Sequence, residues 1–124
     1  MVTAIGVDIV DVARIRRLID RHGERFLVRV LGEHELALVR GRGDTAQFVA
    51  GRFAAKEAVV KALGKYLVER PAWSRIEILP DSSGQPAVTY PQSVMERLAS
   101  VRTLVSISHE KMYAVATAIL SEDA

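Results

Sequence analysis

The chain has 124 residues, of which 49% are apolar and 26% are charged, and this composition is typical of a globular protein with one core. It contains no Cys, which excludes disulfides, Cys-based metal sites and thiol nucleophiles. Its N-terminus lacks the basic region of a signal peptide, and no segment has the apolar length of a transmembrane helix. We therefore expect one soluble, cytoplasmic domain over residues 1–124, without a membrane partner.

The first predicted element is a strand over residues 3–10, because this stretch is short, apolar and rich in β-branched residues. The carboxylate of Asp8 is the anomaly in this strand. Residues 11–22 follow with helical spacing, which begins at a plausible N-cap, Asp11, and ends at Gly23. This helix has its apolar residues on one face and its cations on the other, at Arg14, Arg17 and Arg21.

Two short helices are predicted next, over residues 23–31 and 32–40, and a Gly-rich loop leads from them to the strongest helix of the sequence. This central helix covers residues 45–63, is rich in Ala, and ends at Gly64. Its apolar side chains surround nearly the whole helix axis. A helix with this pattern is buried on most of its sides.

The second half of the chain is predicted to form antiparallel strands, because short alternating runs are separated by turn residues. We expect a first hairpin from residues 75–79 and 85–90, and a short helix over residues 91–99. A second hairpin is expected from residues 103–109 and 112–120, followed by a loose tail over residues 121–124. The predicted fold class is α+β, a single domain with a small antiparallel sheet packed against the long central helix.

Charged side chains within the central helix are the first candidates for chemistry. Arg52 and Lys56 are spaced i, i+4, and so are Glu57 and Lys61. An unpaired buried ion costs several kcal/mol, so these groups need partners or a ligand. The alternative is an ordinary pair on the helix surface between Glu57 and Lys61, which stabilises a helix by only a few tenths of a kcal/mol.

Asp8 and Glu57 together suggest a magnesium site. Magnesium is bound through oxygen ligands, usually one or two carboxylates completed by substrate phosphates and water. Nearby cations at Arg52, Lys56 and Lys61 would neutralise phosphate oxygens, which indicates phosphoryl or phosphodiester transfer. No Gly-rich nucleotide-binding pattern is present. Asp8 could instead be a turn former or a buried hydrogen-bond acceptor.

Three segments carry a resemblance to a known family: residues 5–10 (IGVDIV), residues 51–64, which begin with GRFAAKEA, and residues 106–109 (SISH). In this order and at these separations they resemble the holo-acyl-carrier-protein synthases, the small bacterial group of 4′-phosphopantetheinyl transferases. Further matches extend the resemblance over almost the whole chain, at Arg14-Ile15, Arg25-Phe26, Glu35-Leu36, Ile76-Glu77-Ile78 and Gly84-Gln85-Pro86. Each motif is weak alone, and the set is highly specific.

The resemblance implies that the chain moves the 4′-phosphopantetheine arm of coenzyme A onto a serine of apo acyl carrier protein, releasing 3′,5′-ADP, in support of fatty acid biosynthesis. It implies that Asp8 and Glu57 bind a Mg²⁺ ion at the coenzyme A pyrophosphate, and that these two residues and Lys61 are catalytic. The implied contacts to coenzyme A are Arg52, Lys56, Lys61, Gly64, Ser108 and His109. The resemblance also implies a homotrimer with active sites between neighbouring subunits.

Two roles follow less directly. Carrier proteins are acidic, so the resemblance favours Arg14, Arg17 and Arg21 as their docking surface, although a solvated helix face would have the same pattern. The acceptor of the serine proton stays open among Glu57, a magnesium-bound water and Glu35.

Two positions need separate comment. His109 is interpreted as a phosphate contact rather than as a general base. The chain departs from the family pattern directly after the central helix, where a loop of the Gly-Thr-Gly kind is expected and residues 64–68 read GKYLV. The contacts of this loop to the cofactor are therefore open, and Lys65 could supply a charge in place of backbone amides.

Two other classes of protein remain as alternatives. A metal-dependent nuclease also combines a strand Asp with a Glu and a Lys, but its Glu-x-Lys element lies on a strand. Here Lys56-Glu57 lies within a helix and the Lys comes first, so we expect no nucleic acid among the partners. A non-catalytic oligomerisation module would explain the buried helix and would leave the clustered charges unexplained.

Overall fold

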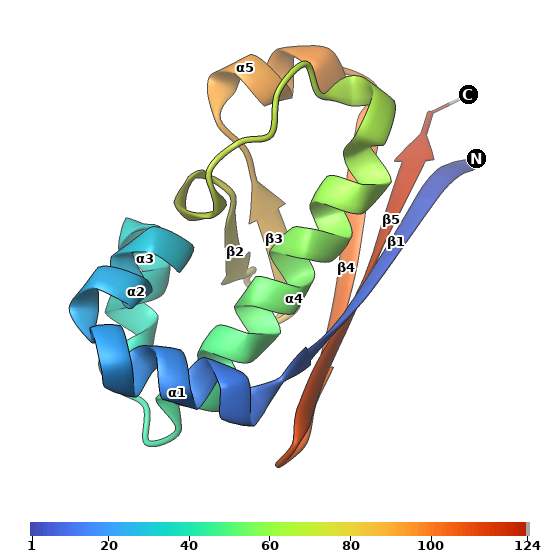
Figure 1. Cartoon of the computed structure of the whole chain (residues 1–124). Coiled ribbons are helices and arrows are strands. Elements are labelled where there is room, and N and C mark those ends of the chain that lie inside the picture. Colours follow the sequence, from blue (N-terminus) through green and yellow to red (C-terminus); the bar gives the residue numbers. More distant parts are fainter. Residues whose placement is uncertain (124) are drawn as a thin grey trace.

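The computed structural model describes residues 1–123. Its larger sheet is antiparallel, and the strands β1 (Val2–Asp11), β5 (Tyr113–Glu122) and β4 (Val101–His109) lie side by side in this order. The long helix α4 (Thr45–Leu63) packs against one face of this sheet (Figure 1). The structure confirms the predicted α+β class and the packing of a small antiparallel sheet on the central helix.

The remaining elements lie around α4 (Figure 1). Helices α1 (Val12–His22), α2 (Glu24–Val30) and α3 (Glu33–Val39) gather near its N-terminal end. Strands β2 (Glu77–Pro80) and β3 (Pro86–Thr89) form a second sheet, which packs on α3, α4 and β4. A short helix, α5 (Gln92–Met95), follows this sheet. Within residues 1–123, no helix has both the length and the apolar character that crossing a membrane requires.

Strand β1 lies unusually close to α4, and this closeness positions the candidate site. A Cβ atom built at Gly6 would lie 2.1 Å from the carbonyl oxygen of Ala58, so any larger residue would push the strand away. The neighbouring strand β5 faces α4 with small buried side chains, at Ala114, Ala116 and Ala118. Because alternate residues of a strand share a face, Asp8 lies on the same side of β1 as Gly6 and is held against the helix.

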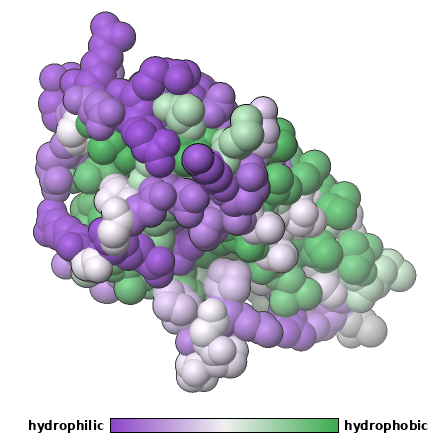
Figure 2. All heavy atoms as spheres, turned by 90° about the horizontal axis from the view of Figure 1, so that it is seen from below, coloured by the Kyte–Doolittle hydropathy of each residue, from purple (hydrophilic) through white to green (hydrophobic). Residues whose placement is uncertain are grey.

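The outer face of the larger sheet is apolar and exposed. Ile5, Val7 and Ile9 of β1 are 67%, 56% and 62% exposed, and Leu104 of β4 is 50% exposed. Figure 2 shows hydrophobic atoms gathered on the side of the molecule that carries this sheet, and hydrophilic atoms on the side that carries the short helices. Such a continuous apolar surface is typical of an interface rather than of a face in water.

Two predicted boundaries are corrected. The predicted helix over residues 91–99 is divided into α5 and a 3₁₀ turn, Glu96–Leu98. The predicted loose tail is wrong for Ser121 and Glu122, which belong to β5 and pair with β1 and β4. The carboxylate of Glu122 also accepts a hydrogen bond from the hydroxyl of Tyr66, which fixes the segment after α4 to the end of the sheet. Ala124, also part of that prediction, lies outside the described residues.

Candidate functional site

Asp8 and Lys61 form the first part of the site, between β1 and α4. The Nζ of Lys61 donates hydrogen bonds to Oδ1 of Asp8 at 3.1 Å and to the carbonyl oxygen of Val7 at 3.0 Å. Side chains on a helix lean toward its N-terminus, so Lys61 reaches back along α4 toward the turn that carries Glu57. The carboxylates of Asp8 and Glu57 therefore face the same region, and their side chains are 20% and 17% exposed.

Glu57 has partners outside its own helix. Its Oε1 accepts a hydrogen bond from Nη2 of Arg70 at 2.6 Å and another from the indole Nε1 of Trp73 at 3.1 Å. The simple surface pair of Glu57 with Lys61 is therefore replaced by two separate ion pairs, Lys61 with Asp8 and Arg70 with Glu57. The two carboxylates that the sequence singled out are both held by cations of the protein.

The chemistry of this donor set fits a magnesium ion that also binds a substrate. Asp8 and Glu57 offer hard oxygen ligands, and both already hold a positive charge. Residues 1–123 contain no group of three or more His, Asp and Glu side chains suited to a metal. An ion here would take its other ligands from phosphate and water, which is how Mg²⁺ is usually bound.

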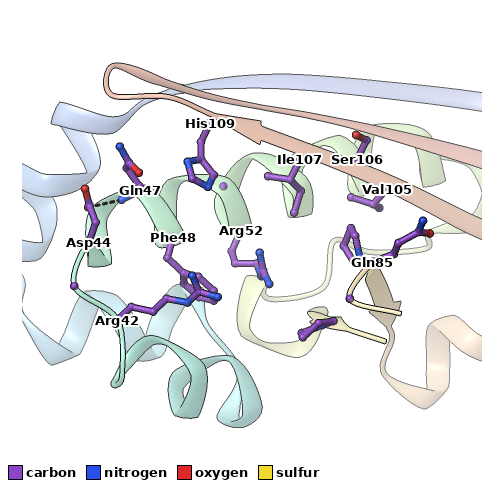
Figure 3. A pocket seen from close by; sticks show the side chains of 15 residues that line it. Arg42, Asp44, Gln47, Phe48, Arg52, Gln85, Val105, Ser106, Ile107 and His109 are labelled. Atoms are coloured by element: carbon purple, nitrogen blue, oxygen red, sulfur yellow. Dashed lines mark hydrogen bonds between the residues drawn. The ribbon is translucent and has the colours of Figure 1, made fainter. Parts of the chain in front are cut away.

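A pocket of about 690 Å³ forms the second part of the site (Figure 3). Its walls come from the N-terminal half of α4, the loop before α4, the turn between β2 and β3, and strand β4. Polar and apolar groups line it together, among them Arg42, Phe48, Arg52, Gln85, Ile107 and His109.

Two arginines in this pocket stack on one aromatic ring. The guanidinium carbons of Arg42 and Arg52 each lie 4.5 Å from the ring centroid of Phe48. Nε of Arg52 donates to the carbonyl oxygen of Ile78 at 2.8 Å, which fixes the side chain and leaves the outer guanidinium nitrogens for a ligand. Burial lowers the pKa of Arg52, Glu35 opposes this shift, and the nearby charge of Arg42 lowers the pKa further. The ring of Phe48 thus holds two guanidinium groups in the pocket, and each of them can bind an anionic group such as a phosphate.

Lys56 lies in the core rather than in the pocket. Its side chain is fully buried, and Nζ donates to Val30 O at 2.6 Å, Glu35 Oε1 at 2.5 Å and Trp73 O at 3.0 Å. Burial lowers the pKa of Lys56, and the carboxylate of Glu35 opposes that shift. All three N–H donors are satisfied within the protein. This position disagrees with the predicted contact between Lys56 and coenzyme A, so we assign Lys56 a structural role.

Glu35 is also unsuited to the proton transfer considered for it. Its side chain is fully buried, and in addition to Lys56 it accepts hydrogen bonds from the amides of Gly32 and Ile78, both at 2.9 Å. Both carboxylate oxygens are therefore occupied. Glu35 joins α3, α4 and β2 and has no access to a substrate.

The other predicted residues lie in different places. His109 lines the pocket from the end of β4, whereas Ser108 is exposed on the opposite face of this strand. Gly64 ends α4 with a φ of 32°, which favours glycine, and it lies one turn beyond Lys61. The predicted docking arginines are all exposed on α1, at Arg14, Arg17 and Arg21.

The two parts of the site face different sides of α4. Asp8, Glu57 and Lys61 do not line the pocket. Glu57 follows Phe48 by nine positions, and at about 100° per residue this is two and a half turns, or the opposite side of the helix. Within one copy of residues 1–123, the predicted metal ligands and the paired arginines therefore do not form a common cavity.

Two functional candidates were missed from the sequence, Arg42 and Arg70. Arg42 stands between two glycines directly before the buried helix, a pattern that predicts only a loop. A cation in such a loop, about one turn before the helix that carries Arg52, is the sequence signal that indicates Arg42 as a candidate ligand-binding residue. Arg70 has no comparable signal, because its contact with Glu57 depends on how the segment after α4 folds back.

Paired carboxylates with basic neighbours, together with an arginine-lined pocket, are chemically suited to a phosphate-containing ligand. The family model of the 4'-phosphopantetheinyl transferase superfamily matches residues 4–118. A holo-[acyl-carrier-protein] synthase of Chlorobaculum tepidum is 46% identical over 115 residues, which cover 93% of this chain and 95% of that relative. The chain belongs to the 4'-phosphopantetheinyl transferase superfamily, and this confirms the family that the sequence motifs indicated.

Solved structures agree with this assignment. The holo-[acyl-carrier-protein] synthase of Neisseria meningitidis matches with a TM-score of 0.87 and 32% identity, over 98% of this chain and 100% of the other. A holo-(acyl-carrier-protein) synthase of Bacillus anthracis, solved in complex with CoA (3',5'-ADP), matches with a TM-score of 0.82 and 34% identity, over 99% of each chain. Both likenesses extend over nearly the whole length of the chains.

Proposed function

We propose that this chain transfers the 4′-phosphopantetheine group of coenzyme A to a serine of an apo acyl carrier protein, and so supports fatty acid biosynthesis. One observation carries the proposal. Two arginines stacked on Phe48 line a pocket, and the same chain places the carboxylate of Asp8, on β1, beside α4, the helix that carries Glu57. Relatives named holo-acyl-carrier-protein synthase, one of them solved with CoA (3',5'-ADP), support this substrate. The whole chain would act as one transferase domain.

The pocket is proposed to hold the nucleotide end of coenzyme A. Arg42 and Arg52 would bind a phosphate group with charge-assisted hydrogen bonds, and His109 would contact the same ligand from β4. The volume of about 690 Å³ lies within the range that is usual for small-ligand sites.

The carboxylate side is proposed to act on the diphosphate. Bound to Asp8 and Glu57, Mg²⁺ would neutralise charge that develops on the phosphoryl oxygens. The serine oxygen of the carrier attacks the β-phosphorus, the bond from this phosphorus to the bridging oxygen breaks, and 3′,5′-ADP leaves. Lys61 would orient Asp8 and stabilise the negative charge on the 5′-phosphate oxygen of the leaving 3′,5′-ADP.

The proton of the serine needs an acceptor, which would be either Glu57 or a water held at the metal, because the burial of Glu35 rules that residue out. Glu35 is buried with both oxygens occupied, whereas Glu57 is half-buried at the site. Its Oε1 accepts from Arg70 and Trp73, and Oε2 remains for a ligand. Hydrogen-bond reach to the serine hydroxyl is the geometric condition for this role.

The active enzyme is proposed to be a homotrimer with sites between subunits. The exposed apolar face of the larger sheet, which includes Ile5, Val7, Ile9 and Leu104, would be covered by neighbouring copies. Assembly would also bring the pocket of one subunit to the carboxylates of the next, which lie on different sides of α4 in one chain. Ser108, exposed on β4, would then face a neighbouring subunit.

The arginines of α1 are proposed to dock the acidic carrier. Arg14, Arg17 and Arg21 are exposed on one helix face, so they would steer a negatively charged partner toward the site. A cytoplasmic location stays a prediction from the sequence. A nuclease or a non-catalytic oligomerisation module finds no support from the named relatives.

The test is to incubate the protein with Mg²⁺, coenzyme A and apo acyl carrier protein, and to weigh the carrier by mass spectrometry. A phosphopantetheine adduct is expected, and its loss is expected in Asp8→Asn and Glu57→Gln. A matched control is Glu24→Gln, which removes an exposed carboxylate that pairs with Arg40 at 2.7 Å and does not line the pocket. An unmodified carrier from the wild-type protein would reject the proposed function.

A further inference from the structure

The ion pair between Arg70 and Glu57 has no role in the transfer described so far. Nη2 of Arg70 lies 2.6 Å from Oε1 of Glu57, the carboxylate that is proposed to bind Mg²⁺. We infer that Arg70 is a built-in counter-ion which occupies Glu57 and is displaced when a divalent cation binds there, so that cation binding moves residues 67–72. This inference rests on the proposed function for the assignment of Glu57 as a metal ligand.

The geometry around Glu57 supports competition rather than sharing. Oε1 already accepts two hydrogen bonds, from Arg70 and from the indole of Trp73. A divalent cation beside this carboxylate would lie within a few ångströms of the Arg70 guanidinium, and two positive charges at that separation repel strongly. The two cations therefore compete for the charge of one carboxylate, although Oε2 accepts no bond within the described residues. Arg70 is the cation that the fold holds less firmly.

Arg70 can withdraw because its segment is held only at its two ends. Residues 67–72 form neither helix nor strand, Val68 is 78% exposed, and the Arg70 side chain is 51% exposed. Exposed ion pairs of this kind are weak, so a ligand can displace the arginine at little cost.

Trp73, the second partner of Glu57, is fixed by contrast. Its carbonyl oxygen accepts from the buried Nζ of Lys56 at 3.0 Å, and its ring packs on Phe53 with centroids 5.0 Å apart. Arg70 lies over the same indole, with its guanidinium carbon 5.8 Å from the ring. Loss of Arg70 from Glu57 would thus change the surroundings of a stationary indole.

This arrangement provides a direct readout, since Trp73 is the one Trp of the chain. The protein is treated with EDTA, dialysed and titrated with MgCl₂ in the absence of coenzyme A, while indole fluorescence and the heat of binding are recorded. We expect a saturable fluorescence change in the wild type. Arg70→Gln should bind Mg²⁺ about three- to ten-fold more tightly, because a competing charge is lost. Its fluorescence change should be smaller, because no guanidinium leaves the ring.

The matched control is Arg40→Gln, which breaks an exposed arginine pair of similar length with Glu24 and should leave Mg²⁺ binding unchanged. Equal Mg²⁺ affinity of wild type and Arg70→Gln, or absence of binding to both, would overturn the inference. The carrier-modification assay separates the counter-ion role of Arg70 from the proposed transferase function. If the wild type modifies the carrier and Arg70→Gln binds Mg²⁺ with unchanged affinity, only the counter-ion role is rejected.

Discussion

Replacing Lys56 by Met tests whether this lysine stabilises the core. The substitution keeps a long apolar stem and removes the charge that Nζ places between Val30 O, Glu35 Oε1 and Trp73 O. Glu35 then remains as an uncompensated buried carboxylate. Removing one partner of a buried pair costs about 3–5 kcal/mol, a large part of the 5–15 kcal/mol that typically separates folded from unfolded states.

The assay is urea unfolding at a fixed protein concentration, with the free energy of unfolding compared between variants. Glu35→Gln should also destabilise, and the double variant Lys56→Met with Glu35→Gln should lose less than the sum of the two single losses. The double variant also keeps the test decisive if Lys56→Met alone does not fold. An exposed pair serves as control: Arg40→Met should cost at most about 1 kcal/mol. A loss of less than about 1 kcal/mol in Lys56→Met would refute the structural role.

Three further predictions concern packing, pH and partner binding. Gly6→Val should lower the free energy of unfolding by about 3 kcal/mol or more in urea titrations, because its Cβ would overlap the backbone of α4. The hydrogen bond to Glu77 raises the pKa of His34 above 6.5. This pair should therefore stabilise the fold fully below pH 6.5, and progressively less as the pH rises through the raised pKa. His34→Gln should remove this pH dependence from melting temperatures recorded between about pH 5.5 and 8.5. Charge reversal at Arg14 and Arg21 should slow carrier modification and weaken its salt dependence, as measured by initial rates at several salt concentrations.

Each of these predictions has its own contrary result. Gly41→Val, where a Cβ meets no atom within 4 Å, should be nearly neutral, and an equal loss at both glycines would contradict the packing argument. Wild-type melting temperatures with the same pH profile as His34→Gln would exclude the proposed pair. Arg97→Glu changes an exposed arginine in the 3₁₀ turn after α5, and α5 and α1 lie at opposite ends of α4 (Figure 1). An equal effect on carrier kinetics there would exclude specific docking.

The sequence predicted the central helix and the strand that carries Asp8 well, because apolar periodicity and caps are local signals. Asp11 accepts from the amide of Ala13 at 2.9 Å and α4 ends at Gly64, as predicted. The prediction of a loose tail is wrong because the short polar run gives no sign that Ser121 and Glu122 extend β5 and pair with β1 and β4. Its order comes from non-local partners, such as the amide of Glu122 donating to the carbonyl of Met1.

The site was predictable in part. Charged residues on a buried helix are unusual and so indicate a site, but the positions of charges in the sequence do not reveal which partner each one finds. Lys56 and Glu57 are neighbours in sequence and point to different sides of α4, so one pairs in the core with Glu35 and the other pairs at the surface with Arg70. Contacts of this kind depend on the tertiary fold, and residue spacing alone does not encode them.

The most direct test of the account combines two inactive variants, with the phosphopantetheine adduct on apo carrier protein as the readout. Glu57→Gln removes the carboxylate side, and Arg52→Ala removes the pocket side; each protein alone should leave the carrier unmodified. When the two are unfolded together in equal amounts and refolded, random assembly should leave about a quarter of the sites between subunits with both residues intact. The account predicts that the mixture recovers about a quarter of the wild-type rate. A mixture as inactive as its two parents, beside an active wild type, would contradict it.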